Sequence, residues 1–534
     1  MKTDHHDARI SGIHHITAIT SSAMENVLFY EEVLGLRLVK QTVNFDDPYT
    51  YHLYYGDDSG TPGTILTFFP WERLPAGRPG TGMVSAVAFS IPENSVHFWI
   101  ERLNDQKTEV QRHSRFGQPV LTFVDPHGLI LELVGTADTP ETTAWRNSSV
   151  PGKHAIAGFH SATMVLSHLD NTRPLLTEIM GMSAAGSENG RTRFTMYDQS
   201  APGHILDVIA DPDVPPAQSG SGTVHHIAFR TENSETQVLW QNMLRRSGIP
   251  VTEVRDRKYF QSIYFHEPGG VLFEIATDPP GFAIDEDIRQ LGEHLQLPDQ
   301  YEPMRTAIQK RLPPLRIPEF QHVYVPAESG EKVAETWVTL HGSGGTEQDL
   351  IRLAQRIREG TPIISPRGKA PENGMSRYFR RLTDNVFDEE DVIFRAHELA
   401  DFLIGAAYRY RRQPEHLIAL GYSNGANIAA ALLLRPEIFS RAILFRPMMP
   451  LQHVDLPNLN RKNILVLRGK YDTVIPAEST ERLIEALKDA GADIEVETIN
   501  SGHELTREDI NLAYKWMAHG EQTIQTESLV QSTS

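Results

Sequence analysis

The sequence predicts an α+β architecture of four repeated βαβββ modules, followed by a domain with a mostly parallel β-sheet. In the first half, four similar apolar segments recur at intervals of roughly 70 residues, and a helix-like stretch and further strands follow each one. From residue 318 onward, single strands alternate with helices, which is the pattern of parallel βαβ units. A chain of 534 residues is long enough for about three domains.

The four modules are recognised by their opening strands. These strands begin at Ile13, Val84, Phe159 and Val224. In the first module, a helix-like stretch over residues 23–34 follows and ends at Gly35. Three modules close with a carboxylate inside an apolar strand, at Glu132, Asp207 and Glu274. The repeated order of elements indicates one structural unit that is used four times.

The last of these carboxylates points to a metal site. Glu274 lies in an apolar strand, on the opposite face from Phe273 and Ile275. Burial of a carboxylate without a partner costs several kcal/mol, so we expect a cation in front of it. His-His pairs open two of the strands, at residues 14–15 and 225–226. Two imidazoles and one carboxylate form the facial triad of non-haem iron sites, so the sequence predicts an Fe(II) site, for which Mn(II) is a plausible substitute.

Over residues 8–314 the repeated βαβββ unit resembles the vicinal-oxygen-chelate (VOC) superfamily of glyoxalases and extradiol dioxygenases. In that superfamily, paired modules curl into cups around a metal ion. The resemblance implies one domain over residues 8–136, with modules one and two, and another over 153–278, with modules three and four. A connector over residues 279–317 follows. The hydroquinone-cleaving branch has a similar connector, and it also resembles the chain at Arg257 and Tyr264.

Alignment of the modules indicates which of them keep metal ligands. The histidine position holds His15, Ala86, Ser161 and His226. The carboxylate position holds Thr67, Glu132, Asp207 and Glu274. Only the outer modules supply imidazoles, so we expect one metal ion, bound by His15, His226 and Glu274, and a second cup without metal. Glu132 and Asp207 are expected to be hydrogen-bonded structural carboxylates. His14, next to a ligand, is a candidate for a hydrogen bond to the ligand set.

The second half contains a nucleophile motif in its usual context. An apolar strand over residues 416–420 runs into Gly421-Tyr422-Ser423-Asn424-Gly425, and a helix of small residues follows. Asp472 and His503 each come after a further strand, and the chain order of Ser423, Asp472 and His503 is that of the α/β-hydrolase triad. We therefore expect these three residues to be catalytic. The backbone N–H groups of Ser343 and Asn424 are expected to form the oxyanion hole.

The motif-bearing half, over residues 318–520, resembles the compact carboxylesterase/lysophospholipase group of α/β-hydrolases. The resemblance implies a mostly parallel sheet without a large lid. Residues 521–534 are rich in Ser, Thr and Gln and are expected to form a disordered tail.

Composition narrows the possible partners and location. The formal net charge of −19 disfavours nucleic acid or an anionic membrane as a partner. The chain has no long apolar run and no apolar segment near its N-terminus, so we expect a cytoplasmic protein. It has no cysteine, which excludes thiolate ligands and cysteine nucleophiles. A homo-oligomer is compatible with the sequence.

These features predict a bifunctional catabolic enzyme. An Fe(II)-dependent, extradiol-type ring-cleaving dioxygenase would use O2 to open a hydroquinone-type aromatic, and a serine carboxylesterase-like hydrolase would act on a small ester or on the ring-cleavage product. Arg257 would stabilise phenolate charge and Tyr264 would move protons. One alternative is a glyoxalase-type, metal-dependent lyase or isomerase fused to the esterase, although such sites generally have four protein ligands. The other is a metal-free ligand-binding or resistance protein fused to the esterase.

Overall fold

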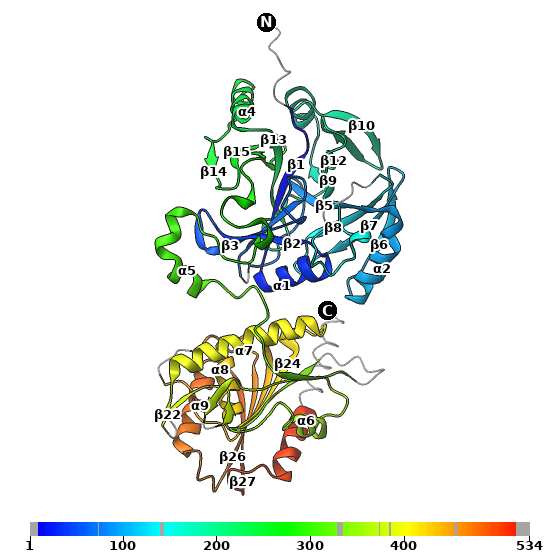
Figure 1. The fold of residues 1–534 in the computed structure, drawn as a ribbon. Helices are drawn as coiled ribbons and strands as arrows, with labels where there is room; N and C mark the ends of the chain where they lie inside the picture. The colour runs from blue at the N-terminus through cyan, green and yellow to red at the C-terminus, as the bar shows by residue number, and fades with distance from the viewer. Residues whose placement is uncertain are drawn as a thin grey trace. The chain divides into compact units, whose positions relative to one another are not determined.

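The computed structural model describes residues 9–72, 74–138, 144–327, 335–372, 374–383, 386–452 and 456–518. The chain divides into two compact units, Met1–Leu315 and Arg316–Ser534 (Figure 1). None of the helices in the described part is both long and apolar enough to cross a membrane. The predicted disordered tail, residues 521–534, lies outside the described residues.

The first unit contains two eight-stranded sheets. Sheet one has the strand order β14-β15-β16-β13-β1-β4-β3-β2. Its strands are β1 (Ile13–Thr20), β2 (Arg37–Asn44), β3 (Asp47–Gly56), β4 (Ile65–Pro70), β13 (Val224–Thr231), β14 (Arg255–Asp256), β15 (Gln261–His266) and β16 (Leu272–Thr277). Sheet two has the order β10-β11-β12-β9-β5-β8-β7-β6. Its strands are β5 (Met83–Pro92), β6 (Gln111–Arg115), β7 (Gln118–Val124), β8 (Ile130–Thr136), β9 (Phe159–Leu166), β10 (Ser183–Glu188), β11 (Arg191–Thr195) and β12 (Ile205–Ala210).

The sheets pair the modules differently from their order in the chain. Chain order predicts one domain over residues 8–136 and another over 153–278. Instead, β1 pairs antiparallel with β13, so modules one and four share sheet one, and β5 pairs antiparallel with β9, so modules two and three share sheet two. Each opening strand is apolar and largely buried. The backbone N–H and C=O groups on one edge of each such strand hydrogen-bond to the opening strand of another module. The partner strand is therefore not the one that is nearest in the sequence.

The strand register confirms the alignment of the four modules. In each module, the residue two positions after the aligned histidine position pairs with the aligned carboxylate position of the closing strand. These pairs are Thr17 with Thr67, Ala88 with Glu132, Thr163 with Asp207 and Ala228 with Glu274. Each module therefore presents the same two positions at the same place on its sheet.

A helical segment follows the opening strand of each module. These segments are α1 (Ala23–Val27) with the π-helix Leu28–Val33, α2 (Val96–Asp105), α3 (Thr172–Pro174) with the π-helix Leu175–Ile179, and α4 (Ser234–Arg246). The longest, α4, begins with a capping box in which Asn233 and Thr236 satisfy each other's backbone N–H groups. It buries Trp240 and Leu244 against the sheet. The helices thus cover apolar faces and leave the opposite faces of the strands for the cups.

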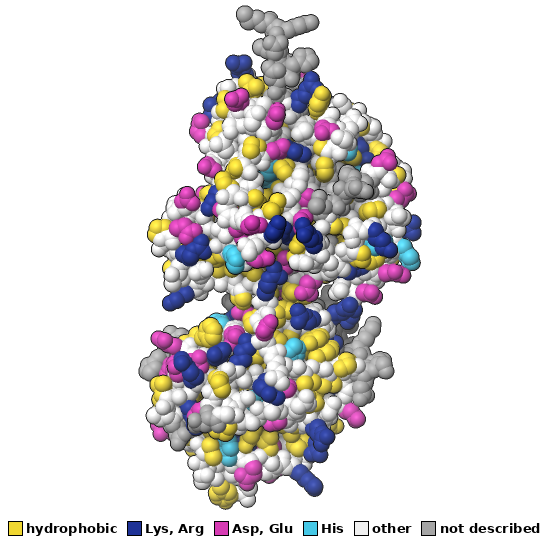
Figure 2. Space-filling model, viewed as in Figure 1, with side chains coloured by type: hydrophobic (Ala, Val, Ile, Leu, Met, Phe, Trp, Pro, Cys, Tyr) yellow, Lys and Arg dark blue, Asp and Glu magenta, His cyan; other side chains and the backbone are white. Residues whose placement is uncertain are grey.

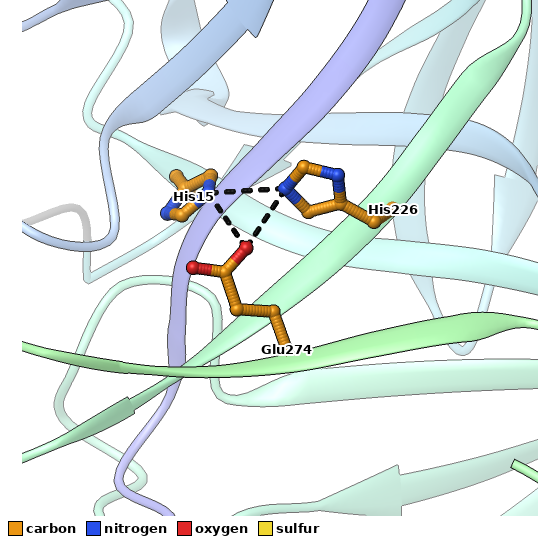
Figure 3. Close-up of side chains that lie close together, drawn as sticks. All are labelled: His15, His226 and Glu274. Atoms are coloured by element: carbon orange, nitrogen blue, oxygen red, sulfur yellow. Dashed lines mark hydrogen bonds and ion pairs between the residues drawn. The ribbon is translucent and has the colours of Figure 1, made fainter. Parts of the chain in front are cut away.

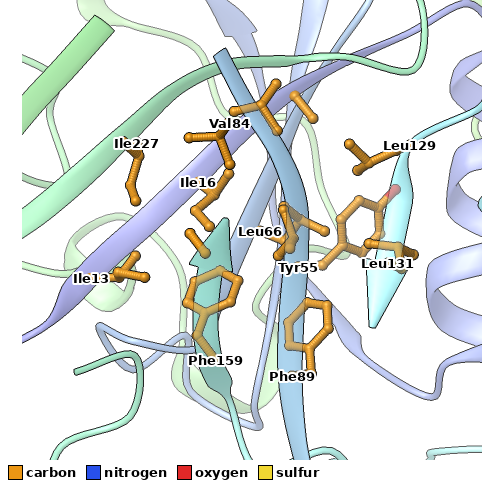
Figure 4. Packing of buried hydrophobic residues seen from close by; sticks show 14 of the residues in the cluster. Ile13, Ile16, Tyr55, Leu66, Val84, Phe89, Leu129, Leu131, Phe159 and Ile227 are labelled. Atoms are coloured by element: carbon orange, nitrogen blue, oxygen red, sulfur yellow. The ribbon is translucent and has the colours of Figure 1, made fainter. Parts of the chain in front are cut away.

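A continuous apolar core joins the two sheets. Figure 4 shows side chains of β1, β5, β9 and β13 that meet there. Phe89 and Phe159 stack with ring centroids 5.2 Å apart, and Ile16 and Ile227 are fully buried. Burial of each such side chain contributes about 1.5–3 kcal/mol. Two of the strands packed in this core, β1 and β13, carry the candidate metal ligands His15 and His226.

The segment after the last module packs against sheet one. Phe282 contacts the rings of Tyr54 and Tyr259, and Asp285 binds the fully buried ammonium group of Lys40 at 2.7 Å. The short helix α5 (Arg305–Arg311) follows. The predicted connector therefore belongs structurally to the first unit up to Leu315.

The second unit is built on a seven-stranded sheet with the order β17-β19-β18-β24-β25-β26-β27. Only β17 is antiparallel to its neighbour within the described part. The strands are β17 (His322–Val325), β18 (Thr336–Leu340), β19 (Ile363–Pro366), β24 (Leu417–Tyr422), β25 (Phe439–Phe445), β26 (Asn463–Gly469) and β27 (Asp493–Ile499). Two small hairpins are formed by β20 (Ala370–Glu372), β21 (Met375–Arg377), β22 (Arg381–Thr383) and β23 (Val386–Phe387). Its helices include α6 (Ile351–Ile357), α7 (Glu389–Arg409), α8 (Asn424–Leu432) and α9 (Ala477–Asp489).

Alternate residues of the central strands pack on opposite faces of this sheet. Leu417 and Ala419 join the core formed with α7, α8 and α9, whereas Ile418 and Leu420 join the core formed with α6. Strands buried on both faces are typical of parallel sheets. Figure 2 shows that Lys and Arg side chains are interspersed with Asp and Glu side chains over the visible face of each unit.

Candidate active sites

Three neighbouring strands of sheet one bring the predicted metal ligands together. His15 comes from β1, His226 from β13 and Glu274 from β16, and their side chains converge on one point (Figure 3). Oε2 of Glu274 lies 2.9 Å from Nε2 of His226 and 3.5 Å from Nε2 of His15. The two Nε2 atoms are 3.3 Å apart. All three side chains are buried.

The protonation states of this cluster suit a divalent cation. Burial alone would raise the pKa of Glu274, but His15 and His226 hold that pKa well below its usual value. Burial lowers the pKa of His226. Oε1 of Glu274 accepts a hydrogen bond from Ser262, whereas Oε2 has no hydrogen-bond donor. We interpret the 2.9 Å separation as two ligand atoms that face the same point, because a charged His226 is disfavoured by burial. An ionised carboxylate oxygen without a donor, beside two imidazole Nε2 atoms, is a metal-binding donor set.

A cavity of about 320 Å³ opens onto this cluster. Its lining is largely aromatic, with Phe45, Phe69, Trp71 and Phe260. Such a pocket fits a small planar ring.

Arg257 and Tyr264 both line the cavity. The Nε–H group of Arg257 donates to the hydroxyl of Tyr264 over 3.3 Å, and the Tyr264 ring lies 5.8 Å from the ring of His226. Burial raises the pKa of Tyr264, so its hydroxyl is protonated at neutral pH. The structure thus brings a cation and a phenol donor to the wall of the cavity beside the metal ligands.

The predicted partner residue His14 lies behind the ligands. Its Nδ1 is 2.9 Å from Nδ1 of His15, and burial lowers its pKa well below the usual value. His225 repeats the arrangement, with Nδ1 2.9 Å from Nδ1 of His226. A histidine that donates its Nδ1–H to the neighbouring ring directs the lone pair of its Nε2 toward the cluster. Thr17 Oγ1 lies 2.9 Å from Nε2 of His226 there.

Polar residues of β3 that were not predicted from the sequence also line the cavity. His52 and Tyr54 lie on β3 and face the cavity, with His52 Nδ1 2.8 Å from the Tyr54 hydroxyl. His52 Nε2 is 2.9 Å from Thr67 Oγ1, which donates to Thr17 over 2.8 Å. Their i, i+2 spacing places them on one face of the strand, and that pattern was the only signal in the sequence.

In the second cup, arginines bind the residues at both aligned carboxylate positions. Arg115 binds Glu132 through two hydrogen bonds of 2.6 Å, and Arg193 binds Asp207 through bonds of 2.8 and 2.9 Å. These are bidentate guanidinium–carboxylate pairs, so both carboxylates are compensated without a metal. Among the described residues, His15, His226 and Glu274 form the one cluster with metal-ligand spacing.

The predicted hydrolase triad is assembled at the carboxyl edge of the seven-stranded sheet of the second unit. His503 Nε2 lies 3.1 Å from Ser423 Oγ, and His503 Nδ1 lies 2.8 Å from Asp472 Oδ2. Ser423 has φ = 52°, a left-handed conformation that is strained for a non-glycine residue. A Cβ atom on Gly425 would lie 1.9 Å from the carbonyl oxygen of Leu340, so the motif needs glycine there.

The predicted oxyanion-hole residues lie in the loop after β18 and at the start of α8. Asn424 is the first residue of α8, so its backbone N–H has no partner within the helix. Its side-chain oxygen accepts from the backbone N–H of Tyr378 over 2.8 Å. Ser343 lies in the loop after β18, and its hydroxyl accepts from Arg377 over 2.7 Å. Both side chains are held in place, which leaves the backbone N–H groups as the candidate donors.

Two family models match the chain. The model of the Glyoxalase/Bleomycin resistance protein/Dioxygenase superfamily matches residues 12–133 and 158–275. The model of the Dienelactone hydrolase family matches residues 379–530. A crystal structure of a related Bacillus subtilis protein superposes with a TM-score of 0.56 at 46% identity and covers 58% of this chain and 99% of that one.

Curated relatives match each half separately. The first half is 47% identical over 308 residues to Putative ring-cleaving dioxygenase MhqO of Bacillus subtilis, which covers 58% of this chain and 97% of the relative. It is 34% identical over 303 residues to Chlorohydroquinone/hydroquinone 1,2-dioxygenase of Sphingobium indicum, which covers 55% and 93%. The second half is 38% identical over 197 residues to Putative hydrolase MhqD of Bacillus subtilis, which covers 37% and 96%.

Proposed function

Because the first half of this chain belongs to the Glyoxalase/Bleomycin resistance protein/Dioxygenase superfamily and its second half to the Dienelactone hydrolase family, we propose that it is a bifunctional catabolic enzyme. The first unit is an Fe(II)-dependent ring-cleaving dioxygenase for hydroquinone-type aromatics. The second is a serine hydrolase that acts on a small ester or on the ring-cleavage product. The observation that carries the first activity is the convergence of His15, His226 and Glu274 beside an aromatic cavity.

The metal would be held by His15, His226 and Glu274. A bound Fe(II) ion supplies a Lewis acid for an ionised ring hydroxyl and a binding position for O2. Mn(II) prefers similar ligands and is the second candidate. A glyoxalase-type site is less well matched, because it generally has four protein ligands and the described residues bring together three.

The cavity residues divide the remaining tasks. Phe45, Phe69 and Phe260 would hold the flat ring by apolar contact. Arg257 would offset the charge of a deprotonated ring hydroxyl, and Tyr264, kept neutral by burial, would donate or pass on a proton at its hydroxyl. A relative named for hydroquinone cleavage supports para-dihydroxy aromatics as the substrate class.

In the second unit, Ser423 would attack the carbonyl carbon of the ester. His503 Nε2 would take the proton from Oγ, and Asp472 would orient the imidazole through Nδ1. The N–H groups of Ser343 and Asn424 would bind the developing oxyanion. His503 would give this proton to the departing alcohol of the ester, which leaves an acyl group on Ser423 Oγ. Water activated by His503 would then hydrolyse this acyl group and release the acid.

The test is metal loading followed by measurement of oxygen uptake. Protein prepared without oxygen is loaded with Fe(II) or Mn(II), its bound metal is counted, and oxygen consumption is followed with hydroquinones and catechols. We expect about one metal ion per chain and oxygen uptake with hydroquinones. His226→Ala should lose both. Full activity after metal removal, or unchanged iron in His226→Ala, would contradict the proposal.

A further inference from the structure

We propose that the buried pair Arg446 and Asp509 positions the catalytic histidine of the hydrolase, a role that rests on the proposed triad of Ser423, Asp472 and His503. Within the part of the chain that the structure describes, the hydrogen bonds of both residues go to groups other than the triad side chains. Instead, the pair holds the backbone on both sides of His503.

Arg446 is placed for this role by the end of β25. It follows the last residue of that strand and has φ = 53°, a left-handed conformation that is unusual for a side chain of its size. Its backbone N–H donates to the carbonyl oxygen of Leu467 on the neighbouring strand β26 over 2.8 Å. Arg446 is 1% exposed, so its guanidinium group must find all its partners within the protein.

Those partners are the residues on either side of His503. The Nε–H group donates to the carbonyl oxygen of Gly502 over 3.1 Å. Nη2 donates to the carbonyl oxygen of Glu504 over 3.1 Å and to Ser501 Oγ over 2.9 Å. The planar guanidinium group of Arg446 thus hydrogen-bonds to the loop on both sides of His503. Because the guanidinium fork is rigid, it fixes the direction of this backbone and not only its distance.

Asp509 neutralises the guanidinium group of Arg446 and also binds Thr506 in the same loop. Its carboxylate accepts from Nη1 over 2.7 Å and from Nη2 over 3.1 Å, and both side chains are fully buried. The same carboxylate accepts from the backbone N–H of Thr506 over 2.7 Å and from the Thr506 hydroxyl over 2.8 Å. The segment from residue 501 to residue 509 is therefore held by hydrogen bonds to one buried ion pair, Arg446 and Asp509.

A further contact ties this loop to the nucleophile. The hydroxyl of Tyr422, the residue before Ser423, donates to the carbonyl oxygen of His503 over 3.2 Å. The loop that carries His503 is therefore held from β25 by Arg446 and from β24 by Tyr422. Displacement of a catalytic group by about 1 Å can reduce turnover on the order of 10²-fold, so fixing this backbone has a direct effect on the rate.

A buried ion pair could instead serve stability alone, so the experiment must separate the two roles. Arg446→Lys keeps the charge but loses the fork. Arg435→Lys is the matched control, because Arg435 binds Asp401 and Glu437 in the same unit and none of its recorded contacts involves the triad. Both variants remove one forked guanidinium pair, and only the first removes contacts with the histidine loop.

The readouts are kcat and KM for a p-nitrophenyl ester, labelling of the serine by a fluorophosphonate probe, and the melting temperature. We expect Arg446→Lys to lower kcat about 10-fold or more and to slow labelling in proportion, with KM changed by about 3-fold or less. Arg435→Lys should lower the melting temperature with kcat within about 2-fold of wild type. Folded Arg446→Lys protein with wild-type kcat, or equal kcat losses in the two variants, would overturn the proposal.

If Arg446→Lys does not fold, Asp509→Asn tests the positioning role of the ion pair instead. It keeps the shape of the side chain but loses its charge, and we expect kcat to fall about 5-fold or more at unchanged KM. Wild-type kcat in this variant would then overturn the proposal. Failure of the triad is recognised separately, because wild-type protein would then not be labelled at Ser423.

Discussion

At the scale of single residues, the cost of burying charge explains most of the chemistry in this chain. A carboxylate enclosed in protein needs a compensating cation, and the three closing-strand carboxylates find one in different ways. Glu132 and Asp207 bind arginine. Glu274 faces two imidazoles and has one oxygen without a donor.

Tyr264 allows a test of the roles within the cavity. Its hydroxyl contacts Arg257 and not the metal ligands in any recorded bond, so Tyr264→Phe should lower kcat with hydroquinone about 10²-fold and leave the metal content unchanged. Tyr55→Phe is the matched control, since the Tyr55 hydroxyl bonds to Asn26 in the core. Metal analysis and oxygen uptake check both variants. Full activity in Tyr264→Phe would rule out a role for the hydroxyl.

His160 predicts a pH dependence of stability. Burial, helped by nearby arginines, lowers its folded pKa to about 3, whereas the unfolded chain titrates near 6.5. The unfolded state therefore binds a proton first, so stability is present at neutral pH and is lost as pH falls below about 6.5. Urea unfolding of the first unit should show that His160→Gln removes about 2 kcal/mol of the loss between pH 7 and pH 5.

The control for this prediction is His97→Gln. The side chain of His97 is 81% exposed, so this variant makes the same chemical change at a surface position. Parallel pH dependences for His160→Gln and wild type would show that His160 is protonated as easily in the folded protein as in the unfolded one.

At the scale of elements, the four modules share one strand register, so residues at equivalent positions of the modules can be compared directly. The same two positions face each cup, and the residue types at these positions decide whether a metal can bind. In sheet two these positions hold Ala86 and Ser161, and the carboxylates are taken by Arg115 and Arg193.

We therefore predict one metal ion per chain, even after histidine is introduced at both histidine positions of the second cup. The double variant Ala86→His and Ser161→His should still bind one equivalent, because the arginines hold both carboxylates of the second cup. Metal counting by elemental analysis after Fe(II) loading provides the measurement. Two tightly bound ions in wild type would refute the prediction, and two in the double variant would show that the arginine pairs do not exclude metal.

At the scale of the whole molecule, the two activities should be separable. The metal cluster and the hydrolase triad lie in different compact units, and no residue belongs to both. Ser423→Ala should abolish p-nitrophenyl ester hydrolysis and leave oxygen uptake within about 2-fold of wild type. His226→Ala should do the reverse. Loss of both activities in a folded single variant would instead indicate a composite site.

Local patterns in the sequence were sufficient for the fold class and for the two sets of candidate residues. The two His-His pairs and the Gly-x-Ser-x-Gly turn each lie within a few consecutive residues, so alternation and spacing reveal them. The βαβββ modules were recognised from similar segments that recur at intervals of roughly 70 residues. The alignment of the four modules followed from the same alternation, and strand register confirms it.

Tertiary structure alone decided which modules share a sheet, because opening strands pair across long sequence separations. It also decided that His52 and Tyr54 line the cavity, that Arg115 and Arg193 fill the second cup, and that Arg446 grips the loop of His503. These residues act through partners on other elements. Their side-chain types are common in any strand or loop, so their roles arise only from contacts that folding creates.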